Sequence, residues 1–225
     1  VMENRLTEVQ RQMTEALHYD LPGESLHAAF NALDQALEER NQVLAGEGGE
    51  ERRVEISVSN ALWGQDGLEV QEAFLDTLAA DYGAGMRIVD FAAAAEAARD
   101  TINSWVAGET NDRIPELIPE GVLTPQTLLV LTNTVYLFAD WALPFDSDAT
   151  ADGPFFRLDG SQASTPFMHQ QLPAAYGAGD GWQAIDLGYV GGEVAMLLVL
   201  PDEGRFDEVA GNAVTLFDEA RDALA

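Results

Sequence analysis

The sequence contains no cysteine and no lysine, and these two absences exclude several classes of protein. Without cysteine there is no disulfide framework, no thiolate metal site and no cysteine nucleophile. The 11 basic residues are all arginine and stand against 39 Asp and Glu, which gives a net charge of −28. Such a surface repels nucleic acid and anionic membranes, so we expect neither as a partner. Because the charges spread along the chain, they favour a high-salt habitat or a compositional bias over an acidic patch that recruits a basic protease.

Motifs of common catalytic and metal sites are also missing. There is no GxSxG elbow, no GxxxxGK[ST] loop and no GxGxxG between a strand and a helix. His18, His27 and His169 are well separated and form no HExxH arrangement, so we interpret them as ordinary surface or half-buried imidazoles. We therefore predict no cofactor, no metal and no enzymatic activity.

One acidic stretch, Asp146-Ser147-Asp148, begins like a calcium-binding loop. The sixth position of that loop requires glycine and the twelfth requires a bidentate carboxylate, but Ala151 and Arg157 occupy them. We interpret the stretch as an acidic turn between strands.

The 225 residues suffice for a sizeable core, and 47% hydrophobic residues argue against disorder. No apolar run is long enough to cross a bilayer. Helical spacing predicts two early helices on either side of residues 21–23, then helices near 70–82 and 93–106 around a short strand at 86–91. After Gly121 strands dominate, with turns at Asp159-Gly160 and at the glycines of 177–181. Helices first and strands later indicate an α+β fold, and the lack of repeats or linkers indicates one domain.

The most informative stretch is LVLTNTVYLFADWALPF, from Leu129 to Phe145. Its first half is an almost unbroken apolar run, which is typical of a strand covered on both faces. We therefore predict that Leu128 to Phe138 is a long interior strand paired with Val54 to Leu62. Asn133 in the middle of this strand must find hydrogen-bond partners once it is buried. Trp141 closes the run as an aromatic anchor.

This stretch, with the segments before and after it, resembles the serpin family. It is similar to the third strand of the large serpin sheet, and Thr150 to Met168 is similar to the two strands that follow. Ile102-Asn103-x-Trp105 resembles the helix that leads into it, and Ile185 to Pro201 resembles two strands of the second sheet. The motif residues are Asn103, Trp105, Thr110, Phe145, Thr150, Phe155, Gly160, Pro166, Met168 and Pro201.

The resemblance implies a serpin-like α+β fold with a large mixed sheet A and parts of sheets B and C. It implies that Asn133 lies in the shutter region, where sheet strands part, and that Trp141 lies at the breach, where the reactive loop first enters. Both residues would then control strand separation and would not be catalysts. The loop inserts into the large sheet as a new strand after cleavage, which releases stored strain.

The resemblance also implies that residues 1–225 form a single serpin domain truncated at both ends, without the early helices and the reactive-centre loop. We expect the parent protein to be a secreted monomer that inhibits serine or cysteine proteases, although a cytoplasmic location stays open. A non-inhibitory carrier of the same fold is the alternative, and a hydrolase of unrelated fold is a remote one. Some positions depart from the family pattern, where glycine or a polar residue is usual: they are Asp112, Phe138 and Ala139, with Gly188 in place of a proline.

Overall fold

The computed structural model describes residues 2–46 and 48–224. By contacts within the chain it divides into two compact units. The first unit comprises Val1–Glu39 and Ile56–Leu137, and the second comprises Arg40–Glu55 and Phe138–Ala225.

The first unit holds helices at or close to the positions that apolar spacing predicts. Their bounds are α1 (Met2–Ala16), α2 (Gly23–Glu38), α3 (Glu72–Tyr82) and α4 (Phe91–Glu109). Helix α4 begins slightly earlier than its alanine-rich run suggests, because the Asp90 side chain accepts a hydrogen bond of 2.9 Å from the Ala93 amide and caps the helix. That bond also lowers the pKa of the Asp90 carboxyl.

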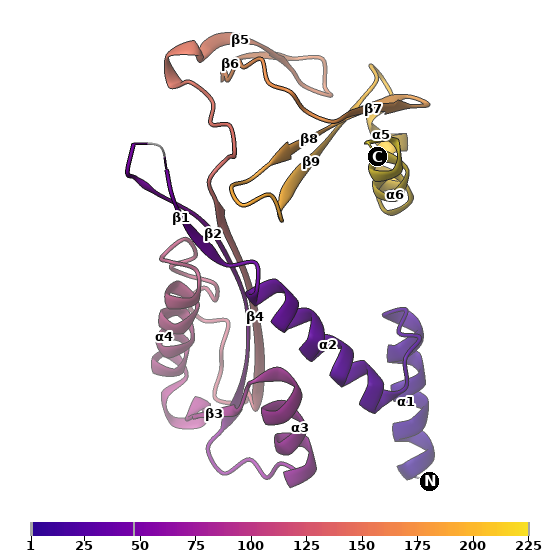
Figure 1. The fold of residues 1–225 in the computed structure, drawn as a ribbon. Coiled ribbons are helices and arrows are strands. Elements are labelled where there is room, and N and C mark those ends of the chain that lie inside the picture. Colours follow the sequence, from indigo (N-terminus) through magenta and orange to yellow (C-terminus); the bar gives the residue numbers. More distant parts are fainter. Residues whose placement is uncertain (1, 47, 225) are drawn as a thin grey trace. The chain divides into compact units, whose positions relative to one another are not determined.

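Strands β2 (Glu51–Gln65), β3 (Met86–Val89) and β4 (Leu129–Ala139) form the sheet of the first unit (Figure 1). Strands β2 and β3 are parallel, from Leu62↔Met86 to Gln65↔Val89. Strand β4 also pairs with β2. The predicted strand and its partner are therefore confirmed, and both β2 and β4 continue into the second unit.

The core of the first unit lies between this sheet and α4 (Figure 1). Trp63 of β2 packs against Trp105 of α4 edge to face, with ring centroids 5.8 Å apart. The buried apolar residues of this cluster are Ala61, Trp63, Phe91, Ala98, Ile102, Val106, Ile118 and Leu123. Burying each large side chain stabilises the fold by roughly 1.5–3 kcal/mol, so this cluster fixes α4 on the sheet.

The prediction that β4 is covered on both faces is wrong. Exposure alternates along the strand: Thr132 and Thr134 are 5% and 3% exposed, whereas Leu131 and Val135 are 75% and 65% exposed. The apolar run hides this alternation, because small polar threonines occupy the face toward α4 and aliphatic residues occupy the other. Strand β4 is also not interior, since among the described residues it pairs with β2 only.

The second unit contains mainly strands. Strand β1 (Gln42–Ala45), which no sequence pattern predicts, pairs antiparallel with the start of β2, from Gln42↔Val54 to Ala45↔Glu51. The remaining elements are η1 (Ser147–Ala149), β5 (Ala151–Phe156), β6 (Gln162–Phe167), β7 (Tyr176–Gly179), β8 (Trp182–Gly188), β9 (Ala195–Pro201), α5 (Phe206–Gly211) and α6 (Ala213–Leu224).

Two antiparallel arrangements follow the predicted turns of the second unit. Strands β5 and β6 form a hairpin, and β7, β8 and β9 form a three-stranded sheet. Gly160 and Gly181 adopt φ of +79° and +81° in the connecting turns, a conformation that side chains with a Cβ rarely take. Trp182 and Ala184 of β8 pack on Leu216 and Ala220 of α6 to form the core of this unit.

Candidate functional site

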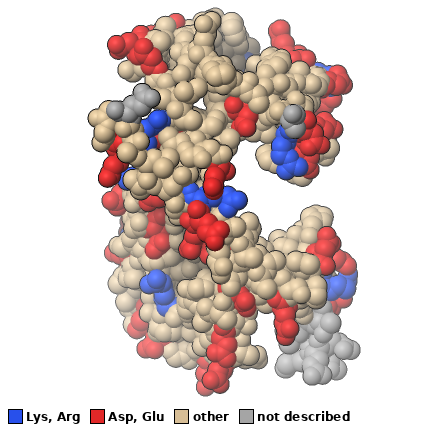
Figure 2. Space-filling view, viewed as in Figure 1, with Lys and Arg blue, Asp and Glu red and all other residues tan. Residues whose placement is uncertain are grey.

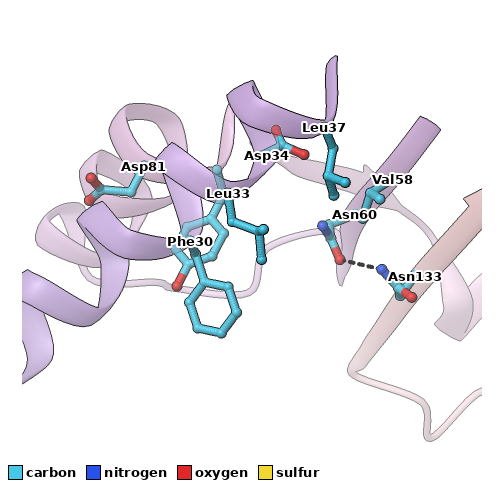
Figure 3. A pocket seen from close by; sticks show the side chains of 9 residues that line it. Phe30, Leu33, Asp34, Leu37, Val58, Asn60, Asp81 and Asn133 are labelled. Atoms are coloured by element: carbon cyan, nitrogen blue, oxygen red, sulfur yellow. Dashed lines mark hydrogen bonds between the residues drawn. The ribbon is translucent and has the colours of Figure 1, made fainter. Parts of the chain in front are cut away.

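Asn133 lies on the face of β4 that is directed away from α4, and it is exposed. The expectation that it is buried is therefore wrong, for the same reason as the two-sided strand. Its side-chain Nδ2 donates a hydrogen bond of 2.9 Å to Oδ1 of Asn60 on β2 (Figure 3). The amide pair thus joins the two strands across their open face.

A hollow of about 280 Å³ lies beside the Asn60–Asn133 pair (Figure 3). Helix α2 contributes Phe30, Leu33 and Leu37 to its wall, and β2 contributes Val58. Apolar side chains therefore approach the amide pair from the helix, and Asp34 and Asp81 add two carboxylates to the lining of the hollow.

A second hollow, of about 500 Å³, has Leu131 and Asn133 of β4 on one side and His27 of α2 on another. At its rim, Nδ1 of His27 lies 2.7 Å from the hydroxyl oxygen of Tyr82, which links α2 to α3. Burial raises the pKa of the Tyr82 hydroxyl, so Tyr82 is neutral at physiological pH.

Trp141 belongs to the second unit and forms an aromatic cluster there. Its ring stacks on Tyr189 with centroids 4.6 Å apart and an interplanar angle of 16°, and it meets Phe145 edge to face at 6.1 Å. An isolated antiparallel bridge joins Trp141 to Tyr189, and the Arg52 guanidinium donates to the Trp141 carbonyl oxygen. The indole thus anchors the segment after β4 to the end of β8, and burial raises the pKa of Tyr189.

Phe138 and Asp140, which come shortly before Trp141, both contact Arg53 of β2. The Arg53 guanidinium lies 4.7 Å from the centroid of the Phe138 ring. The Arg53 amide donates a hydrogen bond of 2.8 Å to the Asp140 carboxylate, and the Asp140 amide donates one of 2.9 Å to the Arg53 carbonyl oxygen. Arg53 therefore binds both an aromatic face and the chain of Asp140 at the end of β4.

The motif residues of α4 have structural contacts. Asn103 is 6% exposed and hydrogen-bonds the backbone of Leu117 and Ile118. Buried Thr110 donates to the Val106 carbonyl oxygen at 2.8 Å at the end of the helix. Trp105 packs against the core through Trp63.

The other motif residues lie in the second unit, mostly on the β5–β6 hairpin. Thr150 ends η1, Phe155 pairs with Ala163, and Gly160 forms the hairpin turn. Pro166 pairs with Asp152, Met168 is exposed after β6, and Pro201 pairs with Trp182 at the end of β9. None of these contacts tests a functional role for the motif residues, which stays a prediction.

Acidic side chains are scattered over the face of the molecule shown in Figure 2, with few arginines among them. Within residues 2–46 and 48–224, no group of three or more His, Cys, Asp or Glu is placed to hold a metal ion. In the same part of the chain, no helix is both long and apolar enough to cross a membrane.

A helix-covered mixed sheet, a separate antiparallel sheet and a β-hairpin define an α+β fold. Comparison with known proteins identifies it: the family described as Serpin (serine protease inhibitor) matches residues 2–221, and the chain belongs to that family. Among solved structures, the Arabidopsis serpin AtSerpin1 in its native stressed conformation matches with a TM-score of 0.77 and 26% identity. That match covers 91% of this chain and 51% of the plant protein. The α+β serpin fold, with its mixed sheet A and parts of sheets B and C, is confirmed.

Some of the proteins that are similar to this chain are named as inhibitors. The leukocyte elastase inhibitor of Xenopus tropicalis is 32% identical over 194 residues, which cover 85% of this chain and 49% of the relative. Antithrombin-III of Mus musculus is 35% identical over 144 residues, 64% of this chain and 31% of the relative. An uncharacterized serpin-like protein of Methanosarcina mazei is 33% identical over 154 residues, 68% of this chain and 36% of the relative. The chain thus spans about a third to a half of the length of these relatives.

The sequence did not reveal which residues would contact the predicted site residues. Asn60 lies in the strand predicted at Val54 to Leu62, but the predicted pairing does not show that its side chain meets Asn133. Arg53 and Asp140 also carry no distinguishing sequence signal, because Arg53 stands next to Arg52 and acidic residues are common in this chain. Their roles depend on which side chains meet across paired strands, and the predicted pairing of the strands does not give that detail.

Proposed function

We propose that this chain is part of a suicide-substrate inhibitor of serine or cysteine endopeptidases. In this proposal the protease cleaves a reactive loop, the loop enters the large sheet as a strand, and the acyl-enzyme stays trapped. The chain supplies strands of that sheet and no catalytic group. Its partner is the target protease, with no role for nucleic acid, membrane or cofactor.

The observation that carries the proposal is the arrangement of β4 within a family whose named members include protease inhibitors. Strand β4 pairs with β2 on one edge, and among the described residues no strand pairs with its other edge. An unpaired strand edge presents backbone donors and acceptors to an incoming strand. In this proposal the Asn60–Asn133 hydrogen bond on β4 and the Trp141 cluster just after β4 control the separation of the strands.

The experiment is an electrophoretic assay with a longer protein that contains this sequence. It is incubated with a trypsin-like, a chymotrypsin-like and a subtilisin-like protease and a papain-like cysteine protease, then boiled in detergent. A band at the summed mass, absent when the protease has been inactivated beforehand, supports the proposal. Cleavage of the protein by every protease without such a band contradicts it. The 225-residue chain by itself should give degradation products only.

A non-inhibitory carrier or binding protein of the same fold is the second candidate. The observation that favours it is the end of β4, where Phe138 lies under Arg53 and Ala139 replaces the usual glycine. Side chains fixed at this point would oppose the opening of the sheet. A longer protein whose melting temperature does not rise after cleavage in the reactive loop would support this candidate.

We further propose that residues 1–225 belong to one serpin domain, truncated relative to the family at both ends. The motivation is the single family match over residues 2–221 together with the partial coverage of the relatives. We also propose a secreted, monomeric parent protein that is not an enzyme. A monomer of the longer protein in size-exclusion chromatography, and its recovery outside intact cells, would support these statements.

A further inference from the structure

Residues 110–127 connect α4 to β4, and we call them the strap. The strap runs back along α4: the Asp112 amide donates to the Ala107 carbonyl oxygen at 2.8 Å, whereas the Gly121 amide donates to the Glu96 carboxylate at 3.1 Å. As residue numbers rise along the strap, the partner numbers on α4 fall. The strap is therefore attached to α4 along the length of the helix.

Part of this attachment is neutral and buried. Asn103 Nδ2 donates to the Ile118 carbonyl oxygen at 2.9 Å, and Asn103 Oδ1 accepts from the amides of Leu117 and Ile118 at 3.1 and 2.9 Å. Ile118 and Leu123 are also members of the core cluster beneath α4. These contacts do not depend on the charge of any side chain.

The other part is charged and centres on Arg99 of α4, whose side chain is 16% exposed. Its guanidinium donates to Glu96 at 2.7 Å, to Asp100 at 2.7 Å and to Glu116 of the strap at 3.2 Å. It also donates to the Ile118 carbonyl oxygen at 3.3 Å. These three carboxylates are the charged groups that act on Arg99.

Glu96 extends the charged attachment to the end of the strap. Its carboxylate accepts from Arg99 and, through the other oxygen, from the Gly121 amide. The hydrogen bond from Arg99 lowers the pKa of Glu96, so Glu96 is ionised at neutral pH and keeps both bonds. One arginine therefore organises contacts that span strap residues 116–121.

We propose that Arg99 is a latch that holds the strap closed on α4, and that opening this latch loosens residues 116–121, which Asn103 and the core then hold alone, while α4 stays on the sheet. Without Arg99 the three carboxylates that contact its guanidinium lose their shared counter-charge and repel one another. The core cluster still holds α4 on the sheet, and Asn103 still bonds strap residues 117 and 118. Because the strap leads directly into β4, a loosened strap gives the start of β4 room to move relative to β2. The inference concerns a motion of this chain and does not depend on the proposed function.

The first test compares two neighbouring carboxylates of the strap by hydrogen–deuterium exchange of the chain. Glu116→Gln removes one partner of Arg99, whereas Glu120→Gln makes the same change of charge at a residue that forms no salt bridge among the described residues. We expect exchange of the Leu117, Ile118 and Gly121 amides to rise by roughly threefold in the first variant, as for the loss of one exposed charged pair. Glu120→Gln should leave these amides unchanged. Equal exchange in the two variants would overturn the proposal.

The second test removes the latch itself with Arg99→Gln, and Arg11→Gln is its control. Arg11 forms similar ion pairs with Glu8 and Glu15, and all three residues belong to α1. Exchange at residues 116–121 should rise roughly tenfold in Arg99→Gln, while amides of β2 and β4 change by less than about twofold. A uniform rise over α4, β2 and β4 would show that Arg99 only stabilises the fold, and would overturn the latch. If Arg99→Gln does not fold, the comparison of Glu116→Gln with Glu120→Gln decides.

Discussion

The eleven residues of β4 alternate between two faces, and these faces lie in opposite environments. On one face Thr132 and Thr134 are buried under α4 and its strap, and on the other Leu131 and Val135 are exposed. Burial therefore does not follow the hydropathy of the side chains along this strand. It follows which element covers each face: α4 and the strap enclose one face, and α2 and α3 border hollows on the other.

The two faces of β4 are also held by different contacts. The enclosed face carries specific hydrogen bonds, such as that from Trp63 Nε1 to Thr132 Oγ1 at 3.0 Å. On the open face, the side-chain amides of Asn60 and Asn133 bond each other. We therefore expect substitutions toward α4 to cost stability and substitutions on the open face to cost little.

The largest effect should come from Asn103→Ala, which removes the neutral attachment between α4 and the strap. Three backbone groups lose their buried partner, so the free energy of unfolding should fall by about 3 kcal/mol. Urea unfolding followed by circular dichroism measures this change. Asn212→Ala is the control, because its exposed side-chain amide donates to the Glu208 carbonyl oxygen and its loss should cost less than about 0.5 kcal/mol. Equal losses in the two variants would show that the strap is not held by Asn103.

A smaller effect is expected from Thr132→Val on the enclosed face. The substitution keeps the shape of the side chain but leaves the buried Trp63 indole N–H without its acceptor. An unsatisfied buried donor costs about 1–2 kcal/mol, and the same urea titration detects it. Stability equal to that of the unsubstituted chain would mean that this hydrogen bond does not hold β4 to β2.

Thr134→Val, at the next enclosed position, should leave the stability of the chain unchanged or raise it. The Thr134 hydroxyl is buried and has no hydrogen-bond partner among the described residues. Replacing a hydroxyl without a partner by a methyl group should leave the free energy of unfolding unchanged within about 0.5 kcal/mol, or raise it. A loss of stability as large as that of Thr132→Val would reveal a partner for this hydroxyl, such as a bound water molecule.

The smallest effect on stability should come from Leu131→Ser on the open face. This side chain is already 75% exposed, so the free energy of unfolding should change by less than about 0.5 kcal/mol. Exposed apolar patches promote association, so the variant should bind less of a hydrophobic fluorescent dye and aggregate less on concentration. Dye fluorescence and light scattering would be compared with those of Thr134→Val. Strong destabilisation by Leu131→Ser would mean that the open face is covered.

The sequence predicted the order and type of most elements because apolar spacing and turn glycines are local signals. Strands β2 and β4 and the helices around them lie at or near their predicted positions. The short strand β1 was not predicted, because its residues pair with β2 through the backbone and show no apolar alternation. The burial of Asn133 was predicted wrongly, since an apolar run does not reveal which side a helix will cover.

The candidate site could be predicted only in part, and for a related reason. Asn133 and Trp141 stand out as a lone amide and an aromatic residue in an apolar stretch. Their partners Asn60 and Tyr189, and the attachment of the strap through Arg99, depend on contacts between segments distant in sequence. The functional roles of these residues stay predictions.

Hydroxyl-radical footprinting of β4 tests most directly whether the strand has one closed and one open face. Modification of each side chain is measured in the folded chain and normalised to the same residue in the chain unfolded with urea. Leu131, Val135 and Leu137 should be modified nearly as strongly in the folded as in the unfolded chain, whereas Tyr136, which is buried, should be protected severalfold. Protection of Leu131 and Val135 together with free modification of Tyr136 would contradict the assignment of the two faces.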